Sequence, residues 1–432
     1  MTLKRKIKKT IVKYVGMDNV QYIFSKYKYF RTKKYKGQTR INKKYVDNRF
    51  KIFEIKNRHV FFGYFDNDQI DKNGEKLLVT SVNLRANTKK DVAYIGYFNI
   101  KNDKKEYVEL ITTKAWCWQQ GARLRFHPFL KNVILYNDVK NGNYVCREFD
   151  IEKKMILNTY CGAFYDVDVN MKYAIGLNYS RLQRLRPGYG YDKLEDTTSE
   201  INAPDNDGIY KIDIKNNTKE LLISLKDLAR ENDSNEKYHH YINHLSISPN
   251  GDRFIFFHIY AIEGYTKWKT RLFVMNMDGG NRKLLEDEHN VSHYCWMDNE
   301  NILITLVNPG KEQYYAMYNV ITGEKNVIGK GTLTLDGHPW ILKNHKSFIS
   351  DTYPDDHSVQ HIYIYDMENG KKKEIAALYS DARLYMEKRC DLHPRVFEYD
   401  DKIVITVDST FADRRRKVLQ ITVSKEKLNK YI

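Results

Sequence analysis

The sequence has few of the features on which secreted and membrane-spanning proteins depend. Its five cysteines are scattered over 432 residues, and no two are spaced as C-x-x-C. An odd number of distant cysteines argues against a disulfide framework and against a zinc ribbon. No segment approaches the ~20 uninterrupted apolar residues of a membrane-spanning helix. These absences predict reduced thiols and a cytoplasmic protein.

Common catalytic motifs are also missing. The chain contains no G-x-S-x-G, no H-E-x-x-H, no G-x-x-x-x-G-K-[ST] and no dinucleotide-binding fingerprint. Each of these motifs marks one particular chemistry at one particular turn or helix. Any active site must therefore be sought in residues that are distant in the sequence.

Aromatic residues are abundant, whereas proline is scarce. The chain has 34 Tyr, 19 Phe and 5 Trp but only 8 Pro. Short runs of Tyr, Phe, Ile and Val favour β-strands. The length is sufficient for one large all-β domain or for two or three smaller ones.

The net charge of +17 is concentrated at the N-terminus. Residues 1–45 carry fifteen Lys and Arg and one acid, Asp18. Their apolar residues recur at roughly helical spacing, and Lys13 interrupts them too early for a signal peptide. We interpret this segment as a basic, helical extension that contacts an anionic membrane surface or an acidic partner, or is simply solvated. Nucleic acid is not expected, because the remainder is nearly balanced in charge and has no known reading motif.

A unit of about four short strands recurs from about residue 58 onward. Roughly 50 residues per four-stranded unit is typical of a β-propeller. Six or eight blades remain alternatives to the seven that we count. The seven units lie near 58–110, 113–157, 159–224, 238–286, 290–329, 335–378 and 389–424.

The last unit is one strand short, which assigns a place to an early strand. We predict that residues 50–55 complete the final blade and close the ring. The chain is thus predicted to be all-β, with a basic extension over 1–47 and a seven-bladed β-propeller over 48–432. The insert at 183–207 is rich in Gly, Pro and Asp, and is predicted to be a long loop over one face, where function tends to collect.

Four histidines recur in phase with this repeat. His244, His293, His338 and His393 are separated by 49, 45 and 55 residues, each near the start of an innermost strand. Equivalent positions of successive blades surround the central channel, so these side chains are expected to converge. Neutral imidazoles suit several divalent metals, and an unligated histidine can act as a general base. The alternative is that each histidine only caps its own strand.

Other polar and aromatic residues fall near the same face. Acids that end the following strands, such as Asp351, can orient the histidines. Arginine forks bind carboxylates at two points, and aromatic rings stack on sugars. The alternatives are that the acids only form turns, that the arginines only make interblade ion pairs, and that the aromatic rings only pack in the core.

Several segments resemble a widespread bacterial propeller family that is loosely grouped with oligogalacturonate lyase and with Tol-system propeller repeats, and that often occurs with polysaccharide genes. The resemblance covers about residues 58–425. It rests on FFGYFDNDQIDKNGEKLL (61–78), TKAWCWQQGARL (113–124), YNDV (136–139), RPGYGY (186–191), NHLSISPNGDRFIFFH (243–258), SHYCW (292–296), DGHPW (336–340), SDTYPD (350–355) and RCDLHPR (389–395).

Oligogalacturonate lyases are seven-bladed propellers that break the bond beside a uronate by β-elimination, and they hold manganese with histidines and a glutamine. The resemblance implies that His293, His338 and His393 bind a divalent metal ion, with manganese favoured, and that His244 is the base. The family's glutamine is replaced: Leu335 and Cys390 stand three residues before two of these histidines.

The sequence therefore predicts a metal-dependent polysaccharide or oligosaccharide lyase acting on uronate-containing glycans, in the cytoplasm or at the inner face of the membrane. The alternative is a non-catalytic propeller that binds glycans or proteins in cell-surface polysaccharide biosynthesis. The predicted site comprises His244, Arg389 and Asp351 as catalytic residues; Arg181, Arg186, Tyr189, Tyr353, Trp118 and Gln120 as substrate-binding residues; and His293, His338 and His393 as metal ligands.

Overall fold

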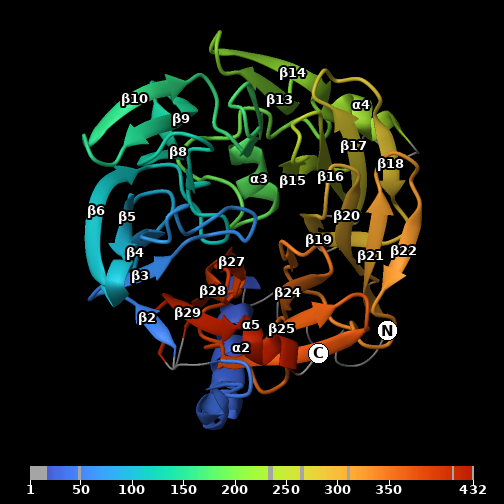
Figure 1. Cartoon of the computed structure of the whole chain (residues 1–432). Helices are drawn as coiled ribbons and strands as arrows, with labels where there is room; N and C mark the ends of the chain where they lie inside the picture. Colours follow the sequence, from blue (N-terminus) through green and yellow to red (C-terminus); the bar gives the residue numbers. More distant parts are fainter. Residues whose placement is uncertain are drawn as a thin grey trace.

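The computed structural model describes residues 17–46, 50–231, 237–262, 267–308, 312–410 and 413–430. Seven antiparallel sheets are arranged around a central axis (Figure 1). This arrangement confirms the predicted seven-bladed β-propeller.

Each blade places its first strand nearest the axis and its last strand at the rim (Figure 1). The strands of the first four blades, in chain order, are β3 (Arg58–Phe61), β4 (Lys76–Asn83), β5 (Ala93–Asn99) and β6 (Glu106–Thr113); β7 (Arg125–Phe126), β8 (Val133–Lys140), β9 (Asn143–Asp150) and β10 (Met155–Tyr160); β11 (Asp166–Val167), β12 (Tyr173–Leu177), β13 (Gly208–Asp213) and β14 (Thr218–Ser224); and β15 (His240–Ile247), β16 (Arg253–Ile262), β17 (Lys267–Asn276) and β18 (Lys283–Glu286).

The remaining three blades include strands from the N-terminal segment. They contain β19 (Asn290–Trp296), β20 (Asn301–Val307), β21 (Gln313–Asn319) and β22 (Lys325–Ile328); β23 (Trp340–Ile341), β24 (Ser347–Asp351), β25 (Val359–Asp366), β26 (Lys371–Tyr379) and β1 (Arg40–Ile41); and β27 (Arg395–Glu398), β28 (Lys402–Ser409), β29 (Lys417–Ser424) and β2 (Lys51–Phe53).

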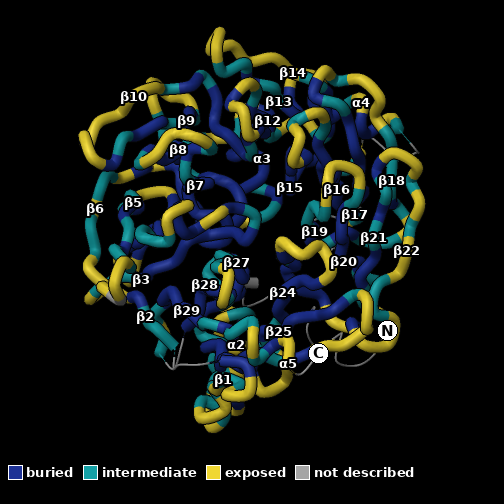
Figure 2. The backbone as a smooth tube through the Cα atoms, in the orientation of Figure 1, coloured by how far each residue is buried: buried dark blue, intermediate teal, exposed yellow. Residues whose placement is uncertain are grey.

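The inner strands are buried on both faces because neighbouring blades pack against each other. In β16, the run Phe254–Phe257 is fully buried, and β24 is buried along its whole length. Strands with no exposed face read as continuous apolar runs rather than as alternating patterns. Figure 2 shows the result, with buried backbone around the axis and exposed backbone at the rim.

The ring is closed by the early strand, as predicted from the sequence. β2 pairs antiparallel with β29, and Phe53 lies opposite Val418. The Phe53 ring also packs 5.2 Å from Phe98 of the first blade. The outermost strand of the seventh blade therefore binds the two ends of the ring together.

The N-terminal segment is helical, as predicted, over the part that the structure describes. It forms α2 (Met17–Thr32) and the 3-10 helix η1 (Lys33–Gln38), followed by β1, which pairs with β26 of the sixth blade. Residues 1–16 of the predicted extension lie outside the described residues. No helix in the described ranges is both long and apolar enough to cross a membrane.

The predicted loop over 183–207 begins inside a short helix. Residues up to Leu185 belong to α3 (Tyr179–Leu185), which reaches toward the axis (Figure 1), and Asn178 caps this helix by accepting from the Arg181 amide. The rest of the insert has no helix or strand, but it is not a loose loop. Tyr189 and Tyr191 are buried, so the insert packs into the propeller instead of lying over it.

The other helices are short and peripheral to the blade cores. They are η2 (Lys101–Asp103), α4 (Leu225–Arg230), η5 (Met386–Lys388) and α5 (Lys425–Lys430).

Replacing Phe53 by Ala tests the closing strand. We expect the free energy of unfolding to fall by about 3–5 kcal/mol, because a fully buried ring is removed from a packed seam. Urea denaturation measures the change. Phe129→Ala is the control, because Phe129 is 60% exposed and its loss should change stability by less than about 0.5 kcal/mol. Equal stabilities of the two variants would contradict the role assigned to β2.

Candidate active site

Four blades bring one histidine each to the central axis. The ring centroids of His293 and His338 are 4.0 Å apart, and those of His338 and His393 are 4.5 Å apart. His244 lies 6.4 Å from His293. All four side chains are buried. The structure therefore places these histidines together, in the order of their blades.

Two of the histidines are held in an unusual backbone conformation. His244 has φ 53° and His393 has φ 47°, which is the left-handed region. His244 also lies in a bulge, where the pairing of β15 with β16 shifts register between Asn243 and Ser246. Bulges and left-handed residues re-aim side chains and cluster at functional sites, at a cost of order 1 kcal/mol each.

The Nδ1 atoms of three histidines are fixed by acceptors. His338 donates from Nδ1 to Asp351 at 2.8 Å, and its backbone N–H donates to the same carboxylate at 2.8 Å. His293 donates to Asp336 at 3.0 Å, and His393 donates to the Gly63 carbonyl at 2.7 Å. Each contact fixes the tautomer, so that the lone pair of the neutral ring is on Nε2.

The Nε2 atoms of His338 and His393 are buried and have no hydrogen-bond partner among the described residues. A buried polar atom without a partner is costly, and in native structures it requires an explanation such as a bound ion, a water molecule or a catalytic role. These two atoms are the donors that a metal ion would use.

Burial controls the protonation of the cluster. It lowers the pKa of His244 and of His393 well below the usual imidazole value, and it also lowers the pKa of His293. Burial acts in the same direction on His338, but the adjacent Asp351 carboxylate outweighs it and raises the pKa of that ring. His244 is thus neutral and can accept a proton, whereas His338 is the imidazole that most readily becomes charged.

Two aromatic rings from the loop after β3 pack among the histidines. Tyr64 stacks on His244 at 5.2 Å and meets His393 edge-on at 4.8 Å. Phe65 packs 5.2 Å from His338. A side chain at Gly63 would place its Cβ 2.8 Å from the backbone of Gln120, so only glycine allows this loop to reach the axis.

His244 has polar neighbours at both ring nitrogens. The Tyr165 hydroxyl lies 3.3 Å from Nδ1, while the Tyr64 hydroxyl lies 3.4 Å and the Asn243 amide nitrogen 3.1 Å from Nε2. The two hydroxyl contacts are long for hydrogen bonds of this type. An incoming group can therefore displace them at small cost.

A cavity of about 890 Å³ opens beside His244 and His293. Arg186 crosses it, with the guanidinium 4.8 Å from the Trp268 ring and 5.4 Å from the Tyr189 ring. The Arg186 backbone bonds to Leu182 and Tyr189, but its guanidinium makes no hydrogen bond or ion pair with a described residue. The predicted site residues that line this cavity are His244, His293, Arg186, Tyr189 and Tyr353. Three lining residues were not predicted: Asp336, Asn243 and Trp268.

Two other predicted residues lie at the edge of this site. Gln120 is buried and donates to the Tyr165 hydroxyl at 2.8 Å, and its carbonyl oxygen has no partner in the described part of the chain. Arg389 donates to Asp391 at 2.8 Å and to the Tyr189 hydroxyl at 2.7 Å. It lines an adjoining cavity of about 340 Å³ rather than the larger one.

Three of the predicted residues occupy supporting positions. The Asp351 carboxylate accepts hydrogen bonds from His338 and from no other residue in the part of the chain that the structure describes, and Asp351 lies outside the cavity lining. Arg181 is buried and donates to the backbone carbonyls of His240, Thr198 and Asn202, so it fastens the insert to the fourth blade. Trp118 is buried in the first blade, where its ring stacks on Phe61 at 5.8 Å.

The predicted metal ligands do not form a ready-made metal centre. In the described ranges, no group of three or more His, Cys, Asp or Glu is arranged to hold a metal ion. The cluster does provide two unpartnered imidazole nitrogens at one point of the axis. Imidazole nitrogens are suitable donors for a divalent ion. Of the three predicted ligands, however, only His338 and His393 present an unpartnered Nε2 atom.

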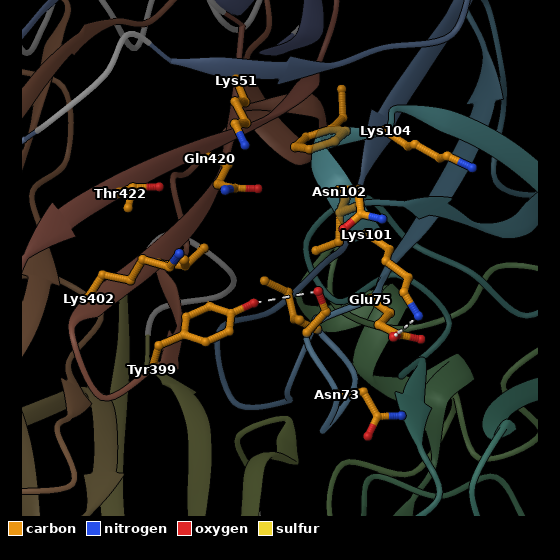
Figure 3. Close-up of a pocket in the computed structure, with 15 residues that line it drawn as sticks. Lys51, Asn73, Glu75, Lys101, Asn102, Lys104, Tyr399, Lys402, Gln420 and Thr422 are labelled. Carbon is orange, nitrogen blue, oxygen red and sulfur yellow. Dashed lines mark hydrogen bonds and ion pairs between the residues drawn. The ribbon is translucent and has the colours of Figure 1, made fainter.

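A second large cavity lies at the seam between the first and last blades. It measures about 610 Å³ and is lined by lysines and amides, with Lys101 paired to Glu75 at 2.7 Å (Figure 3). No histidine or cysteine lines it. We therefore place the candidate active site at the axis.

Solved structures with the same architecture include two lyases. An oligogalacturonate lyase in complex with manganese has a TM-score of 0.64 at 12% identity, covering 88% of this chain and 97% of that one. The oligogalacturonate lyase from Vibrio parahaemolyticus has a TM-score of 0.62 at 14% identity, covering 88% and 98%. A chain of a mitotic checkpoint complex also matches, with a TM-score of 0.51 at 11% identity, covering 89% and 93%.

These likenesses show the fold alone, because a lyase and a checkpoint assembly share it at similarly low identity. No protein-family model matches the sequence, and no curated protein matches it either. The function must be argued from the residues at the axis.

Replacing Asp351 by Asn tests the paired imidazole. Because the folded pKa of His338 is raised, its stabilising effect is fully present below the usual value of 6.5 and is lost as the pH rises through the folded value. We expect the free energy of unfolding to fall by about 2–4 kcal/mol near pH 6, and by less in alkali. Urea denaturation over a series of pH values measures the difference.

The control for this experiment is Asp408→Asn. Asp408 is also buried, but its ionic partner is Arg395, which does not titrate in this range. Its loss should lower stability by an amount that does not change between these pH values. A pH-independent difference for Asp351→Asn as well would contradict the pairing.

Proposed function

We propose that the protein is a carbohydrate-active enzyme that cleaves uronate-containing glycans by β-elimination. The observation that carries this proposal is the convergence of four buried histidines at the axis, two of which, His338 and His393, have unpartnered Nε2 atoms. The other two, His244 and His293, line a cavity that Arg186 also lines. The architecture shared with two oligogalacturonate lyases supports the same reading.

Arg186 is the residue that binds the uronate carboxylate. Its guanidinium projects into the cavity between the rings of Trp268 and Tyr189 and makes no ion pair with a described residue. An arginine beside aromatic rings with no competing ion pair is available for a two-point contact with a carboxylate. The same rings offer flat apolar surfaces to sugar rings, and the cavity volume suits a short oligosaccharide.

His293, His338 and His393 would hold a divalent metal ion. Asp336, Asp351 and the Gly63 carbonyl already orient these rings through Nδ1, as is common for metal-binding histidines. When bound, such an ion supplies Lewis acidity that neutralises the uronate carboxylate and acidifies the neighbouring C5 proton.

His244 is the general base of this proposal. Burial keeps it neutral, and its Nε2 lone pair faces the Tyr64 hydroxyl across a long contact that substrate displaces. His244 takes the C5 proton, the electron pair of that bond forms the C4–C5 double bond, and the C4–O bond to the leaving sugar breaks. The leaving oxygen then takes up a proton.

A non-catalytic propeller that binds glycans or proteins is the second candidate. Two observations favour it: both ring nitrogens of His244 have polar neighbours, and no metal-holding group is arranged in the described ranges. In this case the cavity would bind an acidic glycan through Arg186 without cleaving it. A cytoplasmic role beside cell-surface polysaccharide biosynthesis fits either candidate, and the five cysteines are all free thiols.

Metal content tests the proposed ligands directly. After incubation with Mn²⁺ and dialysis, the protein should retain one ion per chain by elemental analysis. The double variant His338→Ala, His393→Ala should retain none, because it lacks both unpartnered Nε2 atoms. The double variant His345→Ala, His357→Ala is the control, since both of these rings are exposed. A metal-free wild type would favour the second candidate.

Replacing His244 by Gln tests the base. On uronate-containing oligosaccharides, we expect the rate of appearance of the conjugated product, followed by ultraviolet absorbance, to fall about a hundredfold or more, with metal content unchanged. Arg186→Gln should instead raise KM about tenfold, because it removes a carboxylate contact. Glycan binding without any product in the wild type would assign the site to the second candidate.

A further inference from the structure

The helix α2 exposes most of its apolar residues, while one, Val20, is buried. Ile23, Phe24, Tyr27 and Phe30 are 52–62% exposed, and they define what we call the outer face of the helix. At 3.6 residues per turn, positions 23, 27 and 30 lie on one side, with 24 beside them. A surface helix of a globular domain normally has the opposite arrangement, with its apolar residues against the core.

The side of α2 that faces the propeller buries one apolar residue, Val20, and two polar residues. Ser25 and Thr32 are buried, and the Thr32 hydroxyl lies 3.3 Å from the Tyr379 hydroxyl of the sixth blade. On the same side, Arg383 covers the Tyr29 ring at 3.9 Å. β1 then anchors the segment to β26. The orientation of the helix is therefore fixed by contacts on the side that faces the propeller, and Ile23, Tyr27 and Phe30 remain more than half exposed.

The sequence in and around α2 is strongly basic, and two of its basic side chains, Arg31 and Lys33, lie beside the outer face. Residues 17–38 contain six Lys and Arg and a single acid, Asp18, and residues 1–16 add six more with no acid. Arg31 lies 5.7 Å from the Tyr27 ring and Lys33 lies 5.1 Å from the Phe30 ring. Aromatic and aliphatic side chains flanked by lysines and arginines are typical of helices that lie in the interface of an anionic bilayer.

We propose that the outer face of α2 docks the protein onto an anionic lipid surface. The helix lies in the plane of the membrane, with Ile23, Tyr27 and Phe30 inserted at the level of the headgroups and the basic residues paired with lipid phosphates. Its 16 residues span roughly 24 Å along that plane. The basic residues around the face favour an anionic partner. The apolar residues at its centre favour a lipid surface over an acidic protein. In Figure 1, α2 overlaps the sixth and seventh blades for much of its length, and its lower end extends past the edge of the ring.

Vesicle sedimentation with the full-length protein tests this proposal. The protein should bind vesicles of phosphatidylcholine with phosphatidylglycerol at least about tenfold more strongly than vesicles of phosphatidylcholine alone, and salt should weaken the binding. The triple variant Ile23→Ser, Tyr27→Ser, Phe30→Ser should lose about tenfold or more of the partition coefficient. These side chains are exposed, so the fold should be preserved, and circular dichroism checks this.

The matched control is the triple variant Val169→Ser, Ile321→Ser, Val327→Ser. It removes three apolar side chains of the propeller that are 49–52% exposed, and its binding should equal that of the wild type. As an independent readout, the added fluorescence of Phe30→Trp should shift to the blue with anionic vesicles only.

Three outcomes would overturn the proposal. They are equal binding to both kinds of vesicle, an unchanged affinity of the α2 triple variant, and a wild-type dimer that the same variant converts to a monomer. The last outcome, measured by analytical ultracentrifugation without lipid, would assign the outer face to a second copy of the chain.

Discussion

Closure of the ring is the constraint on which the candidate site depends. Phe62 and Gly63 of the first blade donate backbone hydrogen bonds to Asp408 of the seventh blade, which also binds Arg395. This contact fixes the loop that carries Tyr64 beside His393. Without the closing pair of β2 and β29, the first and seventh blades would not be held together, and the aromatic rings would not reach the histidines.

The cost of burying the histidines is met by specific partners. A buried imidazole must be neutral or paired with an acid, because a desolvated charge is strongly unfavourable. Here Asp336 and Asp351 each accept a hydrogen bond from the Nδ1–H of one ring, and the Gly63 carbonyl accepts one from a third ring. Only His338 receives enough negative charge to raise its pKa. The cluster is therefore electrostatically uneven, with one ring ready to carry charge and its neighbours held neutral.

The fold could be predicted from the sequence because it depends on local periodicity. The strand repeat favours seven blades over six or eight, and the missing strand of the last unit identifies residues 50–55 as the closing strand. The histidines could be placed together for the same reason, since equivalent positions of a closed ring lie around one axis. These predictions required only the period of the repeat.

The remaining residues of the site could not be predicted, because their positions depend on loops that have no period. Tyr64 and Phe65 reach the axis because Gly63 allows close passage over Gln120, and no spacing in the sequence encodes that approach. Trp268 acquires its role only through contact with Arg186. Conversely, Arg181 and Trp118 have suitable chemistry, but carbonyl contacts and core packing hold them elsewhere. Among the site residues that were not predicted, only Asp336 had a signal in the sequence, because it is an acid two residues before His338.

The hydrogen bonds that orient the Nδ1 atoms do not by themselves show whether the histidine cluster is an active site or only stabilises the channel. Histidines oriented by acids stabilise a channel as well as they orient metal ligands, so both candidate functions require the same contacts. The difference lies at Nε2. In a purely structural array, selection would favour a partner for each buried nitrogen, because an unsatisfied one costs about 1–3 kcal/mol. The proposed ligand depends on two such atoms, in His338 and His393 of adjacent blades, and on the neighbouring His293, which lines the cavity together with Arg186.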